Sequence, residues 1–599
     1  MLLRTAKIAV AAALVLLLLP GTAAADRAQL KRERLYSAAP ALPVANRHFL
    51  PEGESAPALH RFSGVLLIPE HAMQSEPPSI RPAEVNGKRT QLFPAVELRF
   101  ESHDGHLVPA DRGILRGTGD SYWQIQVEPG RVWSETGDGG LSRASFPFLL
   151  TNEFENETYN GVATFLYDDE TVSQLRYQVV QQLAPFVVQT RYVAAAQVAV
   201  EYERAAVVDR ELIEAFTREL EDRLVWRDWS ELQRGFGVDL LADFDSGIEP
   251  QLVAASGLVI DGEVYVRSMN TPYGAFPYPR QMRHGVWSVT KTAAGLVTLL
   301  RMAQKYGDEI LDYRIRDYVD VSADHDGWRD VTFRHAMSMA TGIGTGTLNV
   351  EPNIIGVGDA SNPANNAGFD DYMRWYFAPT AAEKLAHVFE VPSYPWGPGV
   401  HARYRDRDIF TLSAALAALY RQREGSDASI WQMMMDEVYR PIGIHHLPKL
   451  HTQEADGGGI PLLAWGLYVT IDDIAKIAML LQNGGAHDDV QLLSRAGVAE
   501  AMYENGVVGL PTGESNEFGP KSYHLSLWHE NYRTEAGNVY TAPRMSGYGG
   551  NIVQMMPNGM IGFRFGTGGD RPLEQMTVVA DKMRPFDDFG KTQRRLTAR

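Results

Sequence analysis

The chain has 599 residues, no cysteine and a formal net charge of −18. This length allows two or more domains. The missing cysteine excludes disulfides, lipid-modified cysteine and thiolate zinc sites. The acidic balance opposes binding to nucleic acid or to an anionic membrane surface.

The first 25 residues predict a cleavable secretory signal. Arg4 and Lys7 precede an apolar run over 8–19, and small residues follow up to Ala25. A positive start, a short apolar core and small residues at the end are typical of such signals. The run is short for a bilayer span, so a retained anchor is the less favoured alternative. We expect cleavage after Ala25, a periplasmic or secreted protein, and no stable membrane insertion after cleavage.

Residues 26–207 are predicted to form a β-rich accessory domain. Short β-favourable runs alternate there with glycine and proline turn signals, which indicates a sandwich or barrel. The runs cover 62–68, 95–100, 122–127 and 161–167. One interruption, 171–186, has apolar residues at helical spacing and predicts a helix.

A linking segment and a second domain are expected to follow. Residues 208–235 predict one amphipathic helix, and we place the domain boundary near its end. Strands are expected at 253–260 and 263–267, and again at 551–556 and 560–565, and helical periodicity dominates 288–500. Strands at both ends of a region with helices between them predict an antiparallel sheet built from the two ends and covered by helices. The fold class is therefore α+β.

One short motif suggests nucleophilic chemistry. Ser288-Val289-Thr290-Lys291 opens an apolar run with small residues, which predicts a buried helix starting near Ser288. Residues three apart share a helix face, so Lys291 is expected to lie against the Ser288 hydroxyl. A serine becomes a good nucleophile when a neighbour takes its proton, and a lysine can do this if burial lowers its pKa. On these four residues alone, the alternative is a capping serine with a solvated lysine.

Further motifs follow Ser288 along the chain. They cover 331–343, 398–404, 465–475 and 545–550. Together with Trp287-Ser288-Val289-Thr290-Lys291, their order and spacing resemble the serine β-lactamase and penicillin-binding superfamily, and within it class C β-lactamases, family VIII esterases and 6-aminohexanoate-dimer hydrolases. The resemblance implies that 236–590 form a β-lactamase-like serine hydrolase domain.

The resemblance also implies roles for particular residues. Ser288 would be the acylated nucleophile, Lys291 its proton acceptor, and Tyr404 the group that helps to pass the proton to the leaving group. A packed aromatic side chain is the alternative for Tyr404. The oxyanion hole would be formed by the backbone amides of Ser288 and Tyr548. Ser546 and Gly547, which precede Tyr548, would border the substrate.

Two positions depart from the superfamily's pattern. Tyr404-Arg405-Asp406 stands where Tyr-x-Asn is usual, and Met545-Ser546-Gly547 stands where Lys-Thr-Gly or His-x-Gly is usual. Asp406 and Met545 are accordingly expected at the substrate, with the methionine suited to an apolar group. The missing cation weighs against β-lactamase activity, because an anionic substrate loses a charge-assisted hydrogen bond.

No metal or cofactor is expected. His445, His446 and His451 lie in a predicted loop with no nearby carboxylate pair, which is a poor metal site. The sequence therefore predicts an exported serine hydrolase that cleaves a small ester, amide or short peptide through an acyl-enzyme. The alternative is a binding or sensor protein that resembles penicillin-binding proteins, recognises cell-wall peptides and does not turn them over.

Overall fold

The computed structural model describes residues 27–38, 40–53, 55–205, 207–344, 366–504, 508–568 and 574–589. The predicted signal over 1–25 lies outside these ranges. No helix within them has the length and apolar character needed to cross a bilayer.

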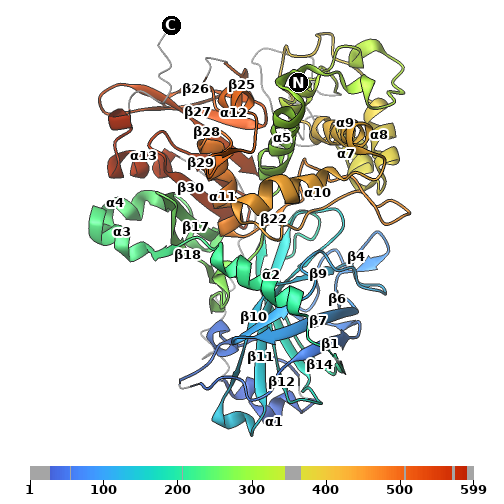
Figure 1. The fold of residues 1–599 in the computed structure, drawn as a ribbon, viewed down its shortest axis with the longest axis vertical. Coiled ribbons are helices and arrows are strands. Elements are labelled where there is room, and N and C mark those ends of the chain that lie inside the picture. The colour runs from blue at the N-terminus through green and yellow to red at the C-terminus, as the bar shows by residue number, and fades with distance from the viewer. Residues whose placement is uncertain are drawn as a thin grey trace, which may run out of the picture.

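One large antiparallel sheet of 11 strands organises the N-terminal part, in the lower half of Figure 1. Its order is β15-β1-β7-β8-β10-β11-β12-β13-β14-β3, and β9 pairs with β11. The strands are β1 Ser63–Ile68, β3 Gln74–Glu76, β7 Val96–His103, β8 His106–Pro109, β9 Gln124–Val127, β10 Gly130–Ser134, β11 Ser142–Thr151, β12 Thr158–Tyr167, β13 Leu175–Leu183, β14 Val193–Val198 and β15 Glu201–Arg204. The four strand runs predicted from the sequence correspond to β1, β7, β9 and β12.

The helix predicted over 171–186 is wrong, because this segment contains strand β13. The strand lies between β12 and β14 and is buried along its whole length. Its Gln178 side chain is paired inside the protein: it accepts from the Val44 backbone N–H and donates to the Val44 carbonyl, both at 2.9 Å. The apolar spacing resembled a helix because both faces of the strand are covered, which removes the alternation that marks a half-exposed strand.

The single helix predicted over 208–235 is also wrong. Helix α2 covers Arg210–Glu221, a short strand β16 covers Trp226–Asp228, and helix α3 covers Trp229–Phe236. The break arises because Asp228 forms a capping box with Glu231 and so starts a new helix. In Figure 1, α2 lies across the junction of the upper and lower parts.

A second sheet of nine strands dominates the remaining chain, in the order β16-β18-β17-β30-β29-β28-β27-β26-β25. Its further strands are β17 Val253–Ile260, β18 Glu263–Ser268, β25 Leu510–Asn516, β26 Gly519–His524, β27 Leu527–Arg533, β28 Val539–Gly547, β29 Asn551–Met555 and β30 Ile561–Gly566. Antiparallel pairing of β17 with β30 joins the two ends of this region. The mixed helix and sheet architecture predicted from the sequence is confirmed, and the division into domains stays a prediction.

Helices cover both faces of the second sheet (Figure 1). Val259 of β17 belongs to the core that contains Leu300 and Ile474, whereas its neighbour Leu258 belongs to the core that contains Met576. This alternation is the period of a strand packed on both sides. The longer helices are α5 Val297–Tyr306, α7 Asn366–Phe377, α8 Ala381–Phe389, α9 Asp406–Glu424, α11 Ile471–Gln482, α12 Arg495–Ala501 and α13 Glu574–Met583.

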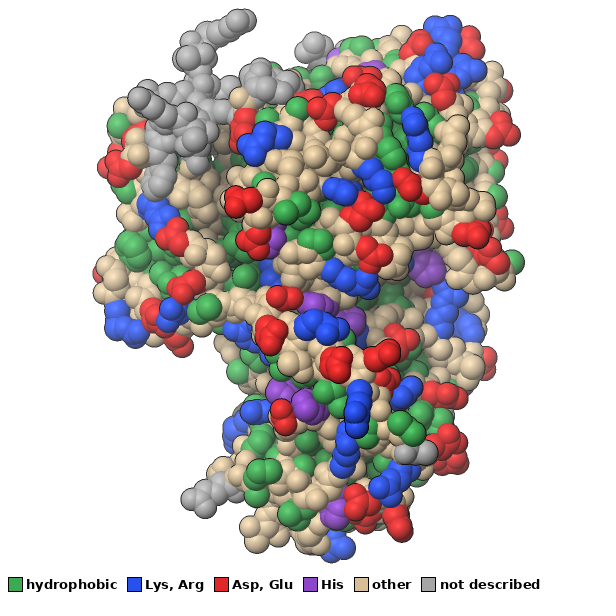
Figure 2. Space-filling model, viewed as in Figure 1, with side chains coloured by type: hydrophobic (Ala, Val, Ile, Leu, Met, Phe, Trp, Pro, Cys, Tyr) green, Lys and Arg blue, Asp and Glu red, His purple; other side chains and the backbone are tan. Residues whose placement is uncertain are grey.

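The surface shows no separation of charge on the face drawn in Figure 2, where acidic and basic side chains lie side by side. Acidic side chains are therefore not gathered into a single patch on this face. That a nucleic acid is not a partner stays a prediction.

Candidate active site

Ser288 lies in a tight turn where β21, His284–Gly285, leads into a buried helix. A π-helical stretch, Lys291–Leu296, continues directly into α5, and such stretches are frequent at functional sites. Trp287 has a φ of 49°, a left-handed conformation that costs energy in a residue with a side chain. Ser288 itself is partly exposed.

The Lys291 ammonium group makes three contacts at the base of this turn. Its Nζ donates to the Ser288 hydroxyl oxygen at 2.7 Å, to Asp406 Oδ1 at 2.5 Å and to the Ala464 carbonyl at 2.9 Å. The lysine side chain is 1% exposed. The capping alternative therefore does not hold, since the lysine is buried against the serine.

The electrostatic state of Lys291 differs from the prediction. Burial lowers the pKa of Lys291, but the Asp406 carboxylate and the Tyr404 hydroxyl outweigh burial and raise the pKa above its usual value. The lysine is therefore an ammonium ion at neutral pH. The condition stated for a neutral lysine base, a pKa lowered by burial, is therefore not met, because the carboxylate partner reverses the effect of burial.

Tyr404 completes the trio of predicted catalytic residues. The Lys291 Nζ lies 4.8 Å from the centre of the Tyr404 ring. Burial raises the pKa of Tyr404, and its interactions with Lys291 and Ser288 only partly offset this, so the phenol is neutral near pH 7. The ring also stacks on Trp528 at 6.1 Å. The structure thus brings Ser288, Lys291 and Tyr404 together.

Asp406 faces the catalytic lysine. It opens helix α9, where the helix dipole favours a carboxylate. Its second oxygen, Oδ2, accepts a hydrogen bond of 2.6 Å from the Tyr372 hydroxyl. A continuous hydrogen-bonded path therefore runs from Ser288 through Lys291 and Asp406 to Tyr372. No sequence motif indicated Tyr372, which lies on α7.

The end of strand β28 borders the nucleophile turn. A Cβ atom built on Gly547 would lie 2.1 Å from the Val286 carbonyl oxygen and 3.2 Å from the Ser288 nitrogen, so a side chain at 547 would clash. Ser546 is half-buried beside it. The Tyr548 ring meets the Trp287 ring edge-on at 5.3 Å. These contacts bring residues 546–548 to the nucleophile, and the oxyanion role of the two amides stays a prediction.

Met545 does not line the site as expected. Its side chain is 0% exposed and belongs to the hydrophobic core. The alternation of side chains along β28 sends Met545 inward, so it supports the site from beneath and offers no surface to a substrate. The neighbouring Arg544 does not replace the missing cation, because its Nη1 forms an ion pair with Glu530 at 2.6 Å.

The N-terminal sheet reaches the nucleophile through Asn156. This side chain, 0% exposed, lies between β11 and β12. Its Oδ1 accepts from the backbone N–H groups of Trp287 at 2.6 Å and Gly466 at 3.0 Å, and its Nδ2 donates to the Leu467 carbonyl at 2.9 Å. Asn156 therefore holds the strained turn in place, a role that no motif indicated.

Replacing Asn156 with alanine is expected to lower kcat by about tenfold or more with little change in KM. The alanine leaves two buried N–H groups unpaired, which costs about 1–3 kcal/mol each and loosens the turn. The matched control is Asn46→Ala, which also removes a buried asparagine linking the two parts, at Thr271 and Gly274. Steady-state kinetics would measure kcat and KM, and thermal melts would measure stability, for both variants. If Asn156→Ala and Asn46→Ala lost the same stability and had the same kcat, the positioning role would be contradicted.

The histidines considered for a metal site make contacts within the protein. His445 Nε2 lies 2.7 Å from Asp222, and His451 contacts the Thr452 carbonyl at 2.8 Å. Among the described residues no group of three or more His, Cys, Asp or Glu side chains is placed to hold a metal ion.

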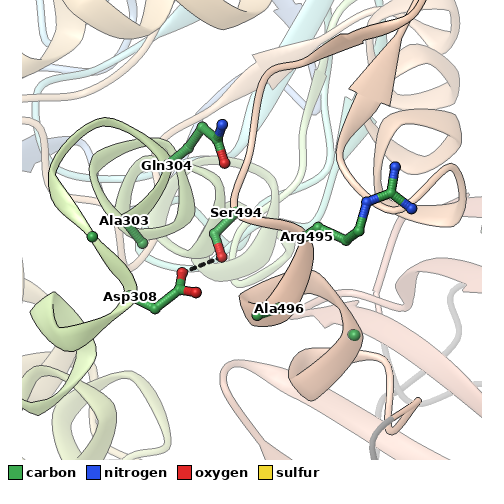
Figure 3. Close-up of a pocket in the computed structure, with 8 residues that line it drawn as sticks. Ala303, Gln304, Asp308, Ser494, Arg495 and Ala496 are labelled. Atoms are coloured by element: carbon green, nitrogen blue, oxygen red, sulfur yellow. Dashed lines mark hydrogen bonds between the residues drawn. The ribbon is translucent and has the colours of Figure 1, made fainter.

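A separate hollow of about 550 Å³ lies between α5 and the start of α12 (Figure 3). Ser494 on its wall donates to Asp308 and caps α12 through the Gly497 N–H. The residues that line the hollow include no lysine, histidine or tyrosine that could relay a proton between Ser494 and a leaving group. This hollow therefore does not compete with Ser288 as a reaction centre.

Comparison with known proteins gives a distant likeness to solved structures. No protein-family model matches the chain, and no curated protein matches it. A Bacillus anthracis protein assigned as a 6-aminohexanoate-dimer hydrolase matches with 17% identity over 59% of this chain and 80% of its own, at a TM-score of 0.41.

Two penicillin-binding protein homologues match at similar levels. The one from Pyrococcus abyssi has 15% identity over 61% of this chain and 79% of its own, with a TM-score of 0.39. The one from Caulobacter crescentus has 16% identity over 60% and 98%, with a TM-score of 0.38. These structures come from the superfamily that the motifs resemble, and the chemistry of this chain rests on its own residues.

Proposed function

We propose that this chain is an exported serine hydrolase that cleaves an uncharged ester or amide through an acyl-enzyme on Ser288. The observation that carries the proposal is the 2.7 Å hydrogen bond between the partly exposed Ser288 hydroxyl and the buried Lys291 Nζ. A nucleophile paired with a titratable group that is itself held by a third group is the arrangement used in covalent catalysis.

A protonated lysine cannot accept a further proton, and the Asp406 carboxylate supplies the missing acceptor. As the Ser288 oxygen attacks the carbonyl carbon, its proton passes to Lys291 while a lysine proton passes to Asp406 Oδ1, 2.5 Å away. The lysine stays charged throughout, and the carboxylate becomes the final proton acceptor. The Tyr372 hydrogen bond to Oδ2 fixes the carboxyl group for this exchange.

After the attack, the tetrahedral intermediate must be stabilised and the leaving group must receive a proton. The backbone amides of Ser288 and Tyr548 would receive the oxyanion. The proton returns through Lys291, and Tyr404, whose ring centre lies 4.8 Å from the lysine Nζ, would pass the proton to the departing alcohol or amine. Water then attacks the acyl group by the same path, which releases the acid and restores Ser288.

A labelling and turnover experiment tests the proposal. A fluorophosphonate probe should add to Ser288, as read by intact mass and peptide mapping, and a neutral p-nitrophenyl ester should be hydrolysed catalytically. Heat-denatured protein is the labelling control. Labelling without turnover of any ester or amide would support the binding alternative, and labelling at another serine would contradict the assigned nucleophile.

A further inference from the structure

Four aromatic rings from separate parts of the chain gather around Phe186, and one of them belongs to Trp287, the residue before Ser288. Phe186 follows β13 in the N-terminal sheet, Trp287 precedes the nucleophile, Tyr376 lies on α7, and Tyr548 follows β28. The Phe186 ring centre lies 5.5 Å from Trp287, 5.8 Å from Tyr376 and 5.7 Å from Tyr548. We refer to these residues as the aromatic wall.

The loop that carries Phe186 is fixed in position. The Trp287 indole donates to the Ala184 carbonyl at 3.2 Å, and a Cβ atom on Gly549 would lie 2.3 Å from the Ala184 Cβ. The Phe186 backbone N–H donates to the buried Glu157 at 3.2 Å. The wall is therefore preformed, which reduces the entropy lost when a ligand binds.

Two features of the wall point to a ligand. Tyr548 is 49% exposed and Phe186 is half-buried, so apolar ring surface remains accessible beside the nucleophile. The Tyr376 ring is 1% exposed, and its hydroxyl has no hydrogen-bond partner among the described residues. An unpaired buried hydroxyl is costly, and an acceptor on a bound ligand would offset that cost.

We infer that the aromatic wall, with Phe186 from the N-terminal sheet, is a subsite that selects an aromatic or broad apolar group on the substrate. This inference rests on the proposed hydrolase function. A neutral group suits the surroundings, because Lys291 is neutralised by Asp406 and Arg544 by Glu530. Aromatic rings favour edge and offset contacts with another ring. The N-terminal part would then help to set specificity.

Kinetics with four esters test the subsite. Methyl acetate is the small reference, benzyl acetate enlarges the alcohol, methyl phenylacetate enlarges the acyl group, and succinic acid monomethyl ester adds a carboxylate. In the full chain, Phe186→Ala should lower kcat/KM about tenfold or more for one or both aromatic esters. This size is typical of losing apolar contacts with a substrate. The rate with methyl acetate should fall by a clearly smaller factor than the rate with the affected aromatic ester.

Matched variants separate selectivity from folding. Phe236→Ala removes a phenylalanine that is 43% exposed at the end of α3, and it should leave all four rates unchanged. Phe186→Leu keeps the apolar volume and should retain an intermediate preference. Equal losses for methyl acetate and the aromatic esters, or preference for the carboxylate ester in the unmodified chain, would overturn the inference. Absence of methyl acetate hydrolysis and of Ser288 labelling would instead defeat the proposed function, and the inference with it.

Discussion

Replacing Ser288 with alanine is expected to reduce kcat/KM by about a thousandfold or more while the protein stays folded. Without the hydroxyl no acyl-enzyme forms, and residual catalysis comes only from binding and the oxyanion site. The structural cost is small, because Lys291 keeps its contacts with Asp406 and the Ala464 carbonyl. Loss of one hydrogen bond costs about 1 kcal/mol.

Ser494→Ala is the matched control for this variant. It also removes a serine hydroxyl that forms a side-chain hydrogen bond, but at the cap of α12, away from the lysine. We expect it to lower stability by about 1 kcal/mol and to leave kcat unchanged. Measured by ester hydrolysis and thermal melts, a loss below about tenfold for Ser288→Ala would identify another nucleophile.

The sequence predicted strands β17, β18, β29 and β30 of the second sheet, because tight turns mark them locally, but it did not predict β25 to β28. The turn Asp261-Gly262 separates β17 from β18, and Asn558-Gly559 lies between β29 and β30. Tight turns fix strand ends locally. The N-terminal part was harder to predict, since β13 is buried on both faces and its polar glutamines find partners only in the folded protein.

The candidate site was predictable in its motifs and not in its electrostatics. Ser288, Lys291 and Tyr404 were found because their spacing and order are visible in one dimension. Tyr372 and Asn156 were missed because they act from α7 and from the N-terminal sheet, through contacts that no sequence period records. The charge of Lys291 depends on the direction of the Asp406 side chain, which only the fold decides.

This charge leads to the prediction that most directly tests the proton path. The pKa of Lys291 is raised, so the lysine is an ammonium ion throughout the neutral range. If Asp406 accepts the proton, the native chain is active in that charged form, and kcat/KM should be nearly flat between about pH 6 and 9. If the neutral amine is required instead, the rate should climb as pH approaches the raised pKa.

The variant Asp406→Asn distinguishes proton transfer to Asp406 from catalysis by a neutral Lys291 amine, because the two mechanisms predict opposite changes in rate at neutral pH. Without the carboxylate, burial dominates and the pKa of Lys291 falls below its usual value of about 10.4. Because asparagine accepts no proton, the variant needs the neutral amine: it should be at least tenfold slower at pH 6 and recover as pH rises. Lys291→Met should lose about a thousandfold at every pH, since no base remains next to Ser288.

Stability measurements provide the check on this variant. A lysine pKa raised by folding stabilises the protein below the unfolded pKa, and this stability is lost as pH rises through the folded pKa. The melting temperature of Asp406→Asn should therefore lie below that of the native chain at pH 7 and approach it as the pH rises through the raised pKa of Lys291. Asp245→Asn breaks a buried ion pair with Arg564 outside the site. It should lower stability but leave the pH dependence of the rate unchanged. A faster Asp406→Asn variant at neutral pH would show that the carboxylate restrains the lysine and does not relay its proton.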